Sequence, residues 1–176
     1  MQVNATGAAL LGLLQRGPLT GYALARTAAE ELGDFWTVTR SQVYRELAAM
    51  GEAGLVEAGE TGPRDRRPFR LTDQGAAAFT AWLHAEPGPD TVRIPLLLRL
   101  AFVEALDPAR LAQLAGAQRA EHERRLAGYR SAERTAFAEG ATAARLMTLR
   151  FGIRYESAVL AWFDEDLAQV APEPPA

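Results

Sequence analysis

Apolar residues near the N-terminus recur at the three- and four-residue spacing of amphipathic helices. The spacing predicts helices over residues 5–15 and 21–32 and a third helix that begins at Thr39. Gln42 stands three residues after Thr39, which is the spacing of a capping box, and Gly54 closes the third helix. Short helices joined by tight turns indicate a helix-turn-helix core.

The next segment has the pattern of a β-hairpin followed by a helix. Residues 55–60 and 67–71 are strand candidates, and residues 61–66 between them carry the Gly and Pro of a turn. Pro68 indicates an edge strand, because proline cannot donate a backbone hydrogen bond to a neighbour. Thr72 then begins a fourth helix. A hairpin directly after a helix-turn-helix core predicts a wing.

Residues 87–95 form a proline-containing linker, and the pattern beyond it is helical again. Helices are expected over residues 96–106, 109–137 and 142–170, and the last two carry apolar residues at a spacing close to a heptad repeat. The fold class is therefore mainly α with a small β-hairpin. Its predicted parts are a winged helix-turn-helix domain, a linker, a helical dimerisation domain and a flexible tail, over residues 1–86, 87–95, 96–170 and 171–176.

The last predicted helix has two apolar faces. The predicted dimerisation face consists of Leu146, Leu149, Ile153, Leu160, Phe163 and Leu167. The other face carries Phe151, Tyr155 and Trp162. Two apolar faces need two partners, and a chain of this length offers little to cover both, so we expect a homodimer in which long helices of two chains pack together. The sequence leaves open which face meets the second chain.

Composition excludes several classes of protein. The chain has 176 residues, of which 48% are hydrophobic and 23% charged, as in an ordinary folded protein. It has no cysteine, which excludes disulfides and thiolate metal sites and fits a cytoplasmic protein. No run of about 18 apolar residues predicts a membrane-spanning helix, and the N-terminus lacks the pattern of a signal peptide. We therefore expect no association with membranes.

The sequence shows no catalytic or metal-binding arrangement. His84 and His122 lie on separate predicted helices, without a carboxylate or thiol pattern around either. Phosphate loops, dinucleotide fingerprints and metal motifs are also missing. Trp36, Trp82 and Trp162 are interpreted as core or interface residues. We predict no enzymatic activity, no cofactor and no metal site.

Polar side chains gather at two places that suit DNA. At the start of the third helix, the side chains expected to point outward are those of Arg40, Ser41, Tyr44 and Arg45. In helix-turn-helix proteins this end of the second helix reaches bases in the major groove. In or beside the hairpin turn stand Arg64, Arg66 and Arg67, and wings commonly meet the backbone or the minor groove. The formal net charge of −3 does not exclude DNA, because DNA experiences the local field of the docking face.

Short motifs in both halves make the chain similar to a known family. Those that resemble the PadR family are Gly21-Tyr22, Val43-Tyr44, residues 54–56 and residues 69–75, and those that resemble its C-terminal, virulence-activator-like domain are residues 95–102 and 149–152. The resemblance, over residues 6–170, implies a homodimeric regulator whose C-terminal helices dimerise. It also implies that Tyr22, Tyr44 and the wing arginines lie near DNA. Some members bind flat aromatic effectors between subunits, so a small aromatic effector is a further expectation.

Two positions depart from the family pattern. Ser41 replaces a frequent Gly and Arg45 a frequent Pro, so the base contacts of other members are not transferred, and Arg45 is interpreted as a reader specific to a subgroup. The predicted DNA-binding residues are Tyr22, Thr39, Arg40, Ser41, Tyr44, Arg45, Arg64, Arg66 and Arg67.

The leading functional hypothesis is repression by a homodimer that binds double-stranded DNA at an inverted-repeat operator and is released by an effector. One alternative is a winged-helix module that dimerises and binds proteins rather than DNA. Another is a small ligand-carrying or enzymatic helical bundle. The wing arginines favour the first hypothesis over the second, and the lack of a catalytic arrangement disfavours the third.

Overall fold

The chain consists of two compact units, Met1–Pro89 and Asp90–Ala176. The structure, a computed structural model, describes residues 3–32, 35–60, 67–90, 92–144 and 146–167. The division between the units falls inside the linker segment 87–95. Each unit has its own cluster of buried apolar residues.

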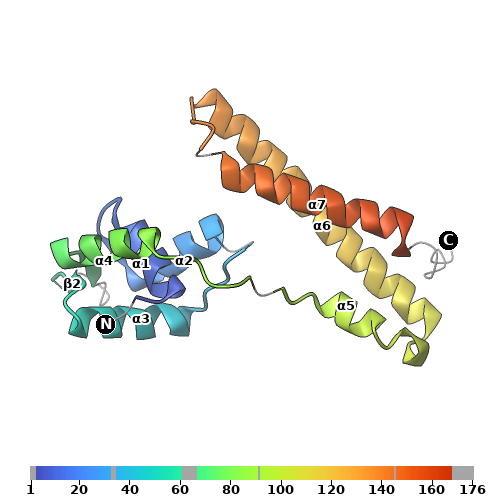
Figure 1. The fold of residues 1–176 in the computed structure, drawn as a ribbon, viewed down its shortest axis with the longest axis horizontal. Coiled ribbons are helices and arrows are strands. Elements are labelled where there is room, and N and C mark those ends of the chain that lie inside the picture. The colour runs from blue at the N-terminus through green and yellow to red at the C-terminus, as the bar shows by residue number, and fades with distance from the viewer. Residues whose placement is uncertain (1–2, 33–34, 61–66, 91, 145, 168–176) are drawn as a thin grey trace. The chain divides into compact units, whose positions relative to one another are not determined.

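The first unit is a helical core with a small sheet at its edge (Figure 1). Its helices are α1 (Ala5–Leu14), α2 (Gly21–Leu32), α3 (Arg40–Glu52) and α4 (Asp73–His84). The predicted capping box is confirmed, because Thr39 Oγ1 accepts from Gln42 N at 3.3 Å and Gln42 Oε1 accepts from Thr39 N at 2.8 Å. Side chains from α1, α2 and α3 form the fully buried centre: Leu10, Leu11, Leu24, Val43, Leu47 and Met50.

The sheet of this unit has three strands, β1 (Leu19–Thr20), β2 (Val56–Ala58) and β3 (Pro68–Leu71), in the order β1-β3-β2. The wing hairpin, β2 and β3, is therefore extended by the strand β1, which the sequence did not predict. The prediction that Pro68 marks an edge strand is wrong, since β3 pairs with both neighbours. Pro68 is tolerated there because it begins the strand and takes part through its carbonyl, which accepts from Gly59 N at 2.7 Å.

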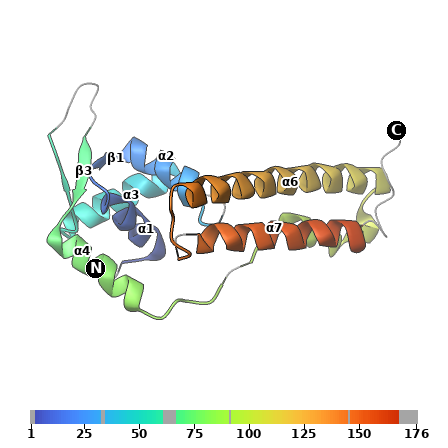
Figure 2. The ribbon, with the colours of Figure 1, turned by 90° about the horizontal axis from the view of Figure 1, so that it is seen from above.

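The second unit is built on two long helices. Its elements are α5 (Pro95–Leu100), the 3₁₀ turn η2 (Val103–Ala105), α6 (Pro108–Ala138) and α7 (Met147–Glu165). Helices α6 and α7 pack side by side and run in opposite directions (Figure 2). Asp107 caps α6, where its carboxylate accepts from Arg110 N at 2.9 Å, and Pro108 is the first helical residue, one position before the predicted start at residue 109.

Two predicted helices of this unit have different limits. The predicted helix 96–106 is interrupted after Leu100 and resumes only as the turn η2; nothing in the local sequence explains the break. The predicted helix 142–170 begins at Met147, and its residues beyond Leu167 lie outside the described part of the chain. No side chain caps α7, and the preceding Leu146 is buried, so packing rather than a capping residue sets its start.

The apolar face predicted to dimerise packs largely inside its own chain. Leu146, Phe163 and Leu167 are at most 5% exposed, and the last two contact Leu96 of α5 and Ala115 of α6. These three side chains are therefore already covered within one chain, and the contact with a second chain is proposed below for other side chains. Phe163 and Leu167 are covered because α5 and α6 fold back onto α7, a pairing that helical periodicity alone does not reveal. The other members, Leu149, Ile153 and Leu160, are half-buried.

Candidate nucleic-acid interface and ligand cavity

The start of α3 presents a polar, exposed surface. Thr39, Arg40, Ser41, Tyr44 and Arg45 are all exposed, while Val43 and Leu47 on the opposite side are buried. The hydroxyl of Thr39 is engaged by the capping box and lies 3.1 Å from Ser41 Oγ. Thr39 thus orients the first turn of α3. The exposed side chains of Arg40, Ser41, Tyr44 and Arg45 form its outward surface.

A close approach between α2 and α3 brings one further predicted residue, Tyr22, into this surface. The guanidinium of Arg40 lies over the ring of Tyr22, 4.8 Å from its centre. Tyr44 packs against Gly21 so tightly that a Cβ at residue 21 would lie 2.6 Å from Tyr44 Cε1. Glycine at position 21 therefore lets the two helix starts meet, which places Tyr22, Arg40 and Tyr44 on one surface.

The arginines of this unit differ in their ion pairs. Arg16, Arg26 and Arg70 pair with Glu31, Glu30 and Glu57 at 2.7, 3.5 and 2.6 Å. Within the described residues, no ion pair is found for Arg40 or Arg45. Their guanidinium groups are thus available to a phosphate or a base edge, which arginine contacts in a bidentate manner.

The wing is described only in part. Arg64 and Arg66 lie outside the described residues. Arg67 is exposed, and its Nε donates to the carbonyl of Gly59 at 3.3 Å across the hairpin. Because this contact uses only Nε, it does not engage the terminal guanidinium nitrogens of Arg67.

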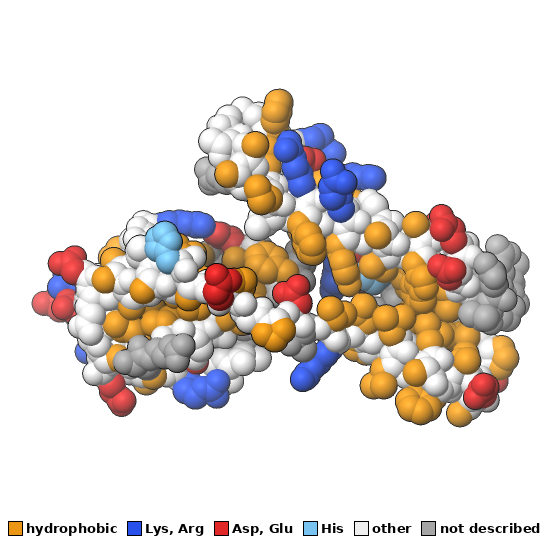
Figure 3. Space-filling model, in the orientation of Figure 1, with side chains coloured by type: hydrophobic (Ala, Val, Ile, Leu, Met, Phe, Trp, Pro, Cys, Tyr) orange, Lys and Arg blue, Asp and Glu red, His pale blue; other side chains and the backbone are white. Residues whose placement is uncertain are grey.

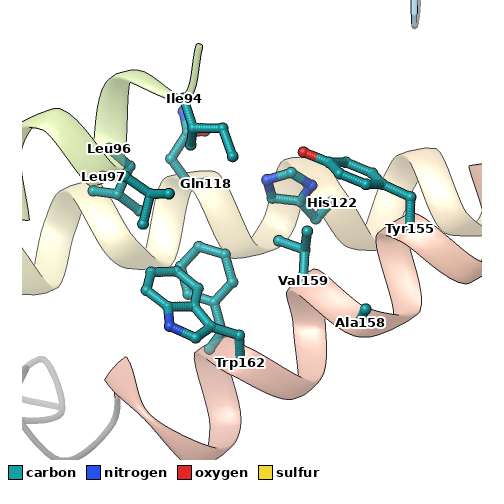
Figure 4. Close-up of a pocket in the computed structure, with 10 residues that line it drawn as sticks. Ile94, Leu96, Leu97, Gln118, His122, Tyr155, Ala158, Val159 and Trp162 are labelled. Atoms are coloured by element: carbon teal, nitrogen blue, oxygen red, sulfur yellow. The ribbon is translucent and has the colours of Figure 1, made fainter. Parts of the chain in front are cut away.

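The second unit contains a cavity of about 290 Å³ between α5, α6 and α7 (Figure 4). It is lined by Ile94, Leu96, Leu97, Gln118, His122, Tyr155, Ala158, Val159, Trp162 and Phe163. The Trp162 and Phe163 rings meet edge to face at 5.0 Å, and the His122 ring lies 5.9 Å from that of Phe163. Most of the wall is apolar, and polar groups enter it from Gln118, His122 and Tyr155.

His122, which lines this cavity, is paired with a buried carboxylate. His122 Nδ1 and Glu156 Oε2 are 2.5 Å apart, and their side chains are 13% and 3% exposed. The sequence interpretation missed this pair, because the two residues are 34 positions apart on different helices. A signal was nevertheless present. Glu156 fills the seven-residue gap between Ile153 and Leu160 in the inward face of α7, and a carboxylate at such a position needs a partner.

Two family models match the chain: the transcriptional regulator PadR-like family over residues 10–81, and virulence activator alpha C-term over residues 92–171. A probable transcriptional regulator of Mycobacterium tuberculosis is 30% identical over 164 residues, which are 83% of this chain and 87% of that protein. This chain belongs to the PadR-like family of transcriptional regulators. The negative transcriptional regulator PadR of Bacillus subtilis is 35% identical to this family member over 102 residues, 56% of each chain.

Solved structures of the Bacillus protein have the fold of this PadR-like regulator. Its complex with operator DNA has a TM-score of 0.78 at 24% identity and covers 95% of this chain and 99% of its own. Its complex with p-coumaric acid has a TM-score of 0.71 at 25% identity, with the same coverage. The predicted winged helix-turn-helix fold is confirmed. In the described part of the PadR-like chain, no helix has the length and hydrophobicity to cross a membrane.

Proposed function

We propose that this PadR-like regulator is a homodimeric repressor that binds an inverted-repeat operator through α3 and the wing. The observation that carries the proposal is the exposed start of α3, where Arg40 and Arg45 have no ion pair within the described residues and Arg40 lies over the Tyr22 ring. A solvated helix face usually pairs its charges or alternates their sign, whereas this surface combines two guanidinium groups, which only donate, with hydroxyl groups that can also donate. Donors suit phosphate oxygens and the acceptor edge of guanine.

The residues divide by their expected contacts. Arg45 and Ser41 lie on the outward side of the first turns of α3, and we assign them to base edges. Arg40 is held over the Tyr22 ring, which fixes its direction, and we assign it with Tyr44 to phosphates that flank the bases. Arg64, Arg66 and Arg67 of the wing are assigned to the DNA backbone or the adjacent minor groove.

The proposed dimer surface lies on the second unit. Its apolar side chains include several that are at least 66% exposed: Leu98, Phe102, Phe137, Met147 and Phe151. Figure 3 shows apolar side chains gathered over the helices of this unit. Phe137 and Met147 stand at the connection between α6 and α7, whereas Leu98 and Phe102 lie at the opposite end of α6. In a two-fold symmetric dimer, the exposed apolar side chains at one end of α6 in one protomer can pack against those at the opposite end of α6 in its partner.

The inference that the protein represses transcription, rather than activating it, rests on its relatives. The Bacillus relative is a negative transcriptional regulator, and one of its structures contains p-coumaric acid. We infer that this protein likewise occludes a promoter in the cytoplasm and leaves the DNA when a small aromatic effector binds. No step of this function requires catalysis, a cofactor or a metal ion. The alternative of a protein-interaction module without DNA binding offers no use for unpaired arginines at the start of α3.

The deciding experiment is selection of bound fragments from random DNA by the purified full-length protein. We expect the recovered sites to be inverted repeats whose half-sites are about one helical turn, roughly 34 Å, or a multiple of it apart. A protein with Arg40 and Arg45 both changed to Gln should recover no preferred sequence. Asymmetric sites, or sites recovered equally by that variant, would contradict the proposal.

A further inference from the structure

The cavity of the second unit has the dimensions and walls of a site for one aromatic ring. Its volume of about 290 Å³ is at the small end of ligand sites, which span roughly 300–1,000 Å³. Trp162 and Val159 line it from α7, and the aliphatic chains of Leu96 and Leu97 line it from α5 (Figure 4). Such a space excludes large polycyclic molecules and favours a flat monocyclic compound with a short substituent.

One ring nitrogen provides the directional contact. Glu156 engages Nδ1 of His122, so only Nε2 can contact an occupant of the cavity. When the ionised carboxylate holds the proton on Nδ1, the neutral imidazole presents Nε2 as a hydrogen-bond acceptor. An acceptor inside an apolar wall selects a ligand that brings a donor, such as a hydroxyl group. The hydroxyl of Tyr155 lies beside the His122 ring, and Gln118 lines the cavity next to Ile94.

The charge of this site disfavours an anionic ligand. None of the described residues that line it is Lys or Arg. In the tautomer that accepts from a ligand hydroxyl, the imidazole is neutral, so its pair with the ionised Glu156 carboxylate carries a net charge of −1. A carboxylate ligand would therefore lose its hydration without meeting a compensating cation, which is costly in a protein interior.

We propose that the cavity binds an uncharged phenol, with the phenolic hydroxyl donating to His122 Nε2 and the ring between Trp162 and the α5 side chains. This inference rests on the proposed function only in taking the phenol to be the effector that releases DNA. Binding itself requires no DNA, so the two can fail separately. The site would thus prefer a compound without the carboxylate of p-coumaric acid.

The test is isothermal titration calorimetry of the full-length protein with three matched probes at neutral pH. Methyl p-coumarate has the phenol and no charge, p-coumaric acid adds the carboxylate, and methyl 4-methoxycinnamate lacks the hydroxyl donor. We expect the first to bind, and each of the others to bind at least about tenfold more weakly. The reasons are an uncompensated charge in one case and an unpaired Nε2 in the other.

Variants locate the site and test the role of the charge. Ala158 is exposed at the cavity wall, so Ala158→Leu should obstruct binding, while Ala127→Leu at an exposed position of α6 outside the cavity should not. Glu156→Gln keeps the volume and a hydrogen bond to Nδ1 but removes the negative charge. It should therefore reduce the preference for the ester over the acid several-fold, and circular dichroism of each variant checks its folding.

Several outcomes would overturn the proposal. They are equal affinity for the ester and the acid, no binding of any probe to the wild-type dimer, or unchanged binding by Ala158→Leu. The second result would indicate that a side chain of the second copy fills the cavity. Specific DNA binding that persists alongside any of these results would leave the proposed function intact.

Discussion

The contact between Gly21 and Tyr44 predicts a substitution that separates DNA binding from stability. In Gly21→Ala, the new Cβ would lie 2.6 Å from Tyr44 Cε1 and 3.0 Å from Cζ, so the ring must move. Tyr44 is 51% exposed, and its ring can turn into solvent. Alanine is favoured over glycine in a helix interior by about 0.5–1 kcal/mol, and at the first residue of α2 part of this preference offsets the lost ring contacts. We therefore expect the free energy of unfolding to change by less than about 1 kcal/mol.

Operator affinity should respond differently to the same substitution. A displaced Tyr44 loses its place beside the phosphates, and one such contact contributes about 1–2 kcal/mol, or roughly tenfold in affinity. Fluorescence anisotropy with labelled operator measures this change, and thermal unfolding measures stability. Gly51→Ala is the matched control, because a Cβ at that exposed position of α3 meets nothing within 4 Å.

A double-mutant cycle tests whether the effect passes through Tyr44. If it does, Gly21→Ala should weaken binding no further in a protein that already carries Tyr44→Ala. An equal loss of affinity in both backgrounds would refute the reasoning, as would a Gly21→Ala protein that binds operator like the wild type.

Four further predictions concern the fold, the DNA contacts and the assembly. Gly75→Ala should destabilise the first unit by about 3 kcal/mol or more, because its Cβ would lie 2.0 Å from the fixed carbonyl oxygen of Leu55; a thermal unfolding curve like that of the wild type would contradict this. Arg45→Ala should cost about 1–3 kcal/mol at the selected operator and much less on random DNA, and an equal loss on both in anisotropy titrations would reassign it to a phosphate. Arg66→Ala should weaken binding to both DNAs and lower the salt slope by about 0.9, so an unchanged slope would remove it from the interface. A fragment of residues 1–86 should sediment as a monomer and bind the full operator about 10²–10⁴-fold more weakly than the intact dimer. Equal affinity of the fragment and the intact protein would show that dimerisation does not contribute to operator binding.

Elements with strong local signals could be predicted from the sequence. The helices of the first unit begin and end close to the predicted residues because their ends depend on neighbours in the chain. The clearest case is the Thr39–Gln42 capping box, followed by Gly54 with a φ of 70°. The exposed set at the start of α3 follows from the same periodicity, since the buried positions Val43 and Leu47 leave only one outward side.

Contacts between distant segments could not be predicted in this way. The pairing of β1 with β3 places Leu19 opposite Phe69, and no local sequence pattern around either residue predicts the other as its partner. The Tyr22–Arg40 and His122–Glu156 contacts are of the same kind, because each depends on two helices meeting at a particular register.

The sequence alone therefore determined the fold class and the residues that are candidates for DNA binding, because periodicity, capping and turn chemistry are properties of adjacent residues. It also indicated the family, through the resemblance of its short motifs. Only the tertiary structure decided which apolar face of α7 is covered by its own chain. Periodicity shows that Leu146 and Phe151 lie on apolar faces, but it does not show that α5 and α6 fold over the face of Phe163 and leave Phe151 exposed. That choice depends on the summed burial of residues far apart in the chain, and it also created the cavity beside His122.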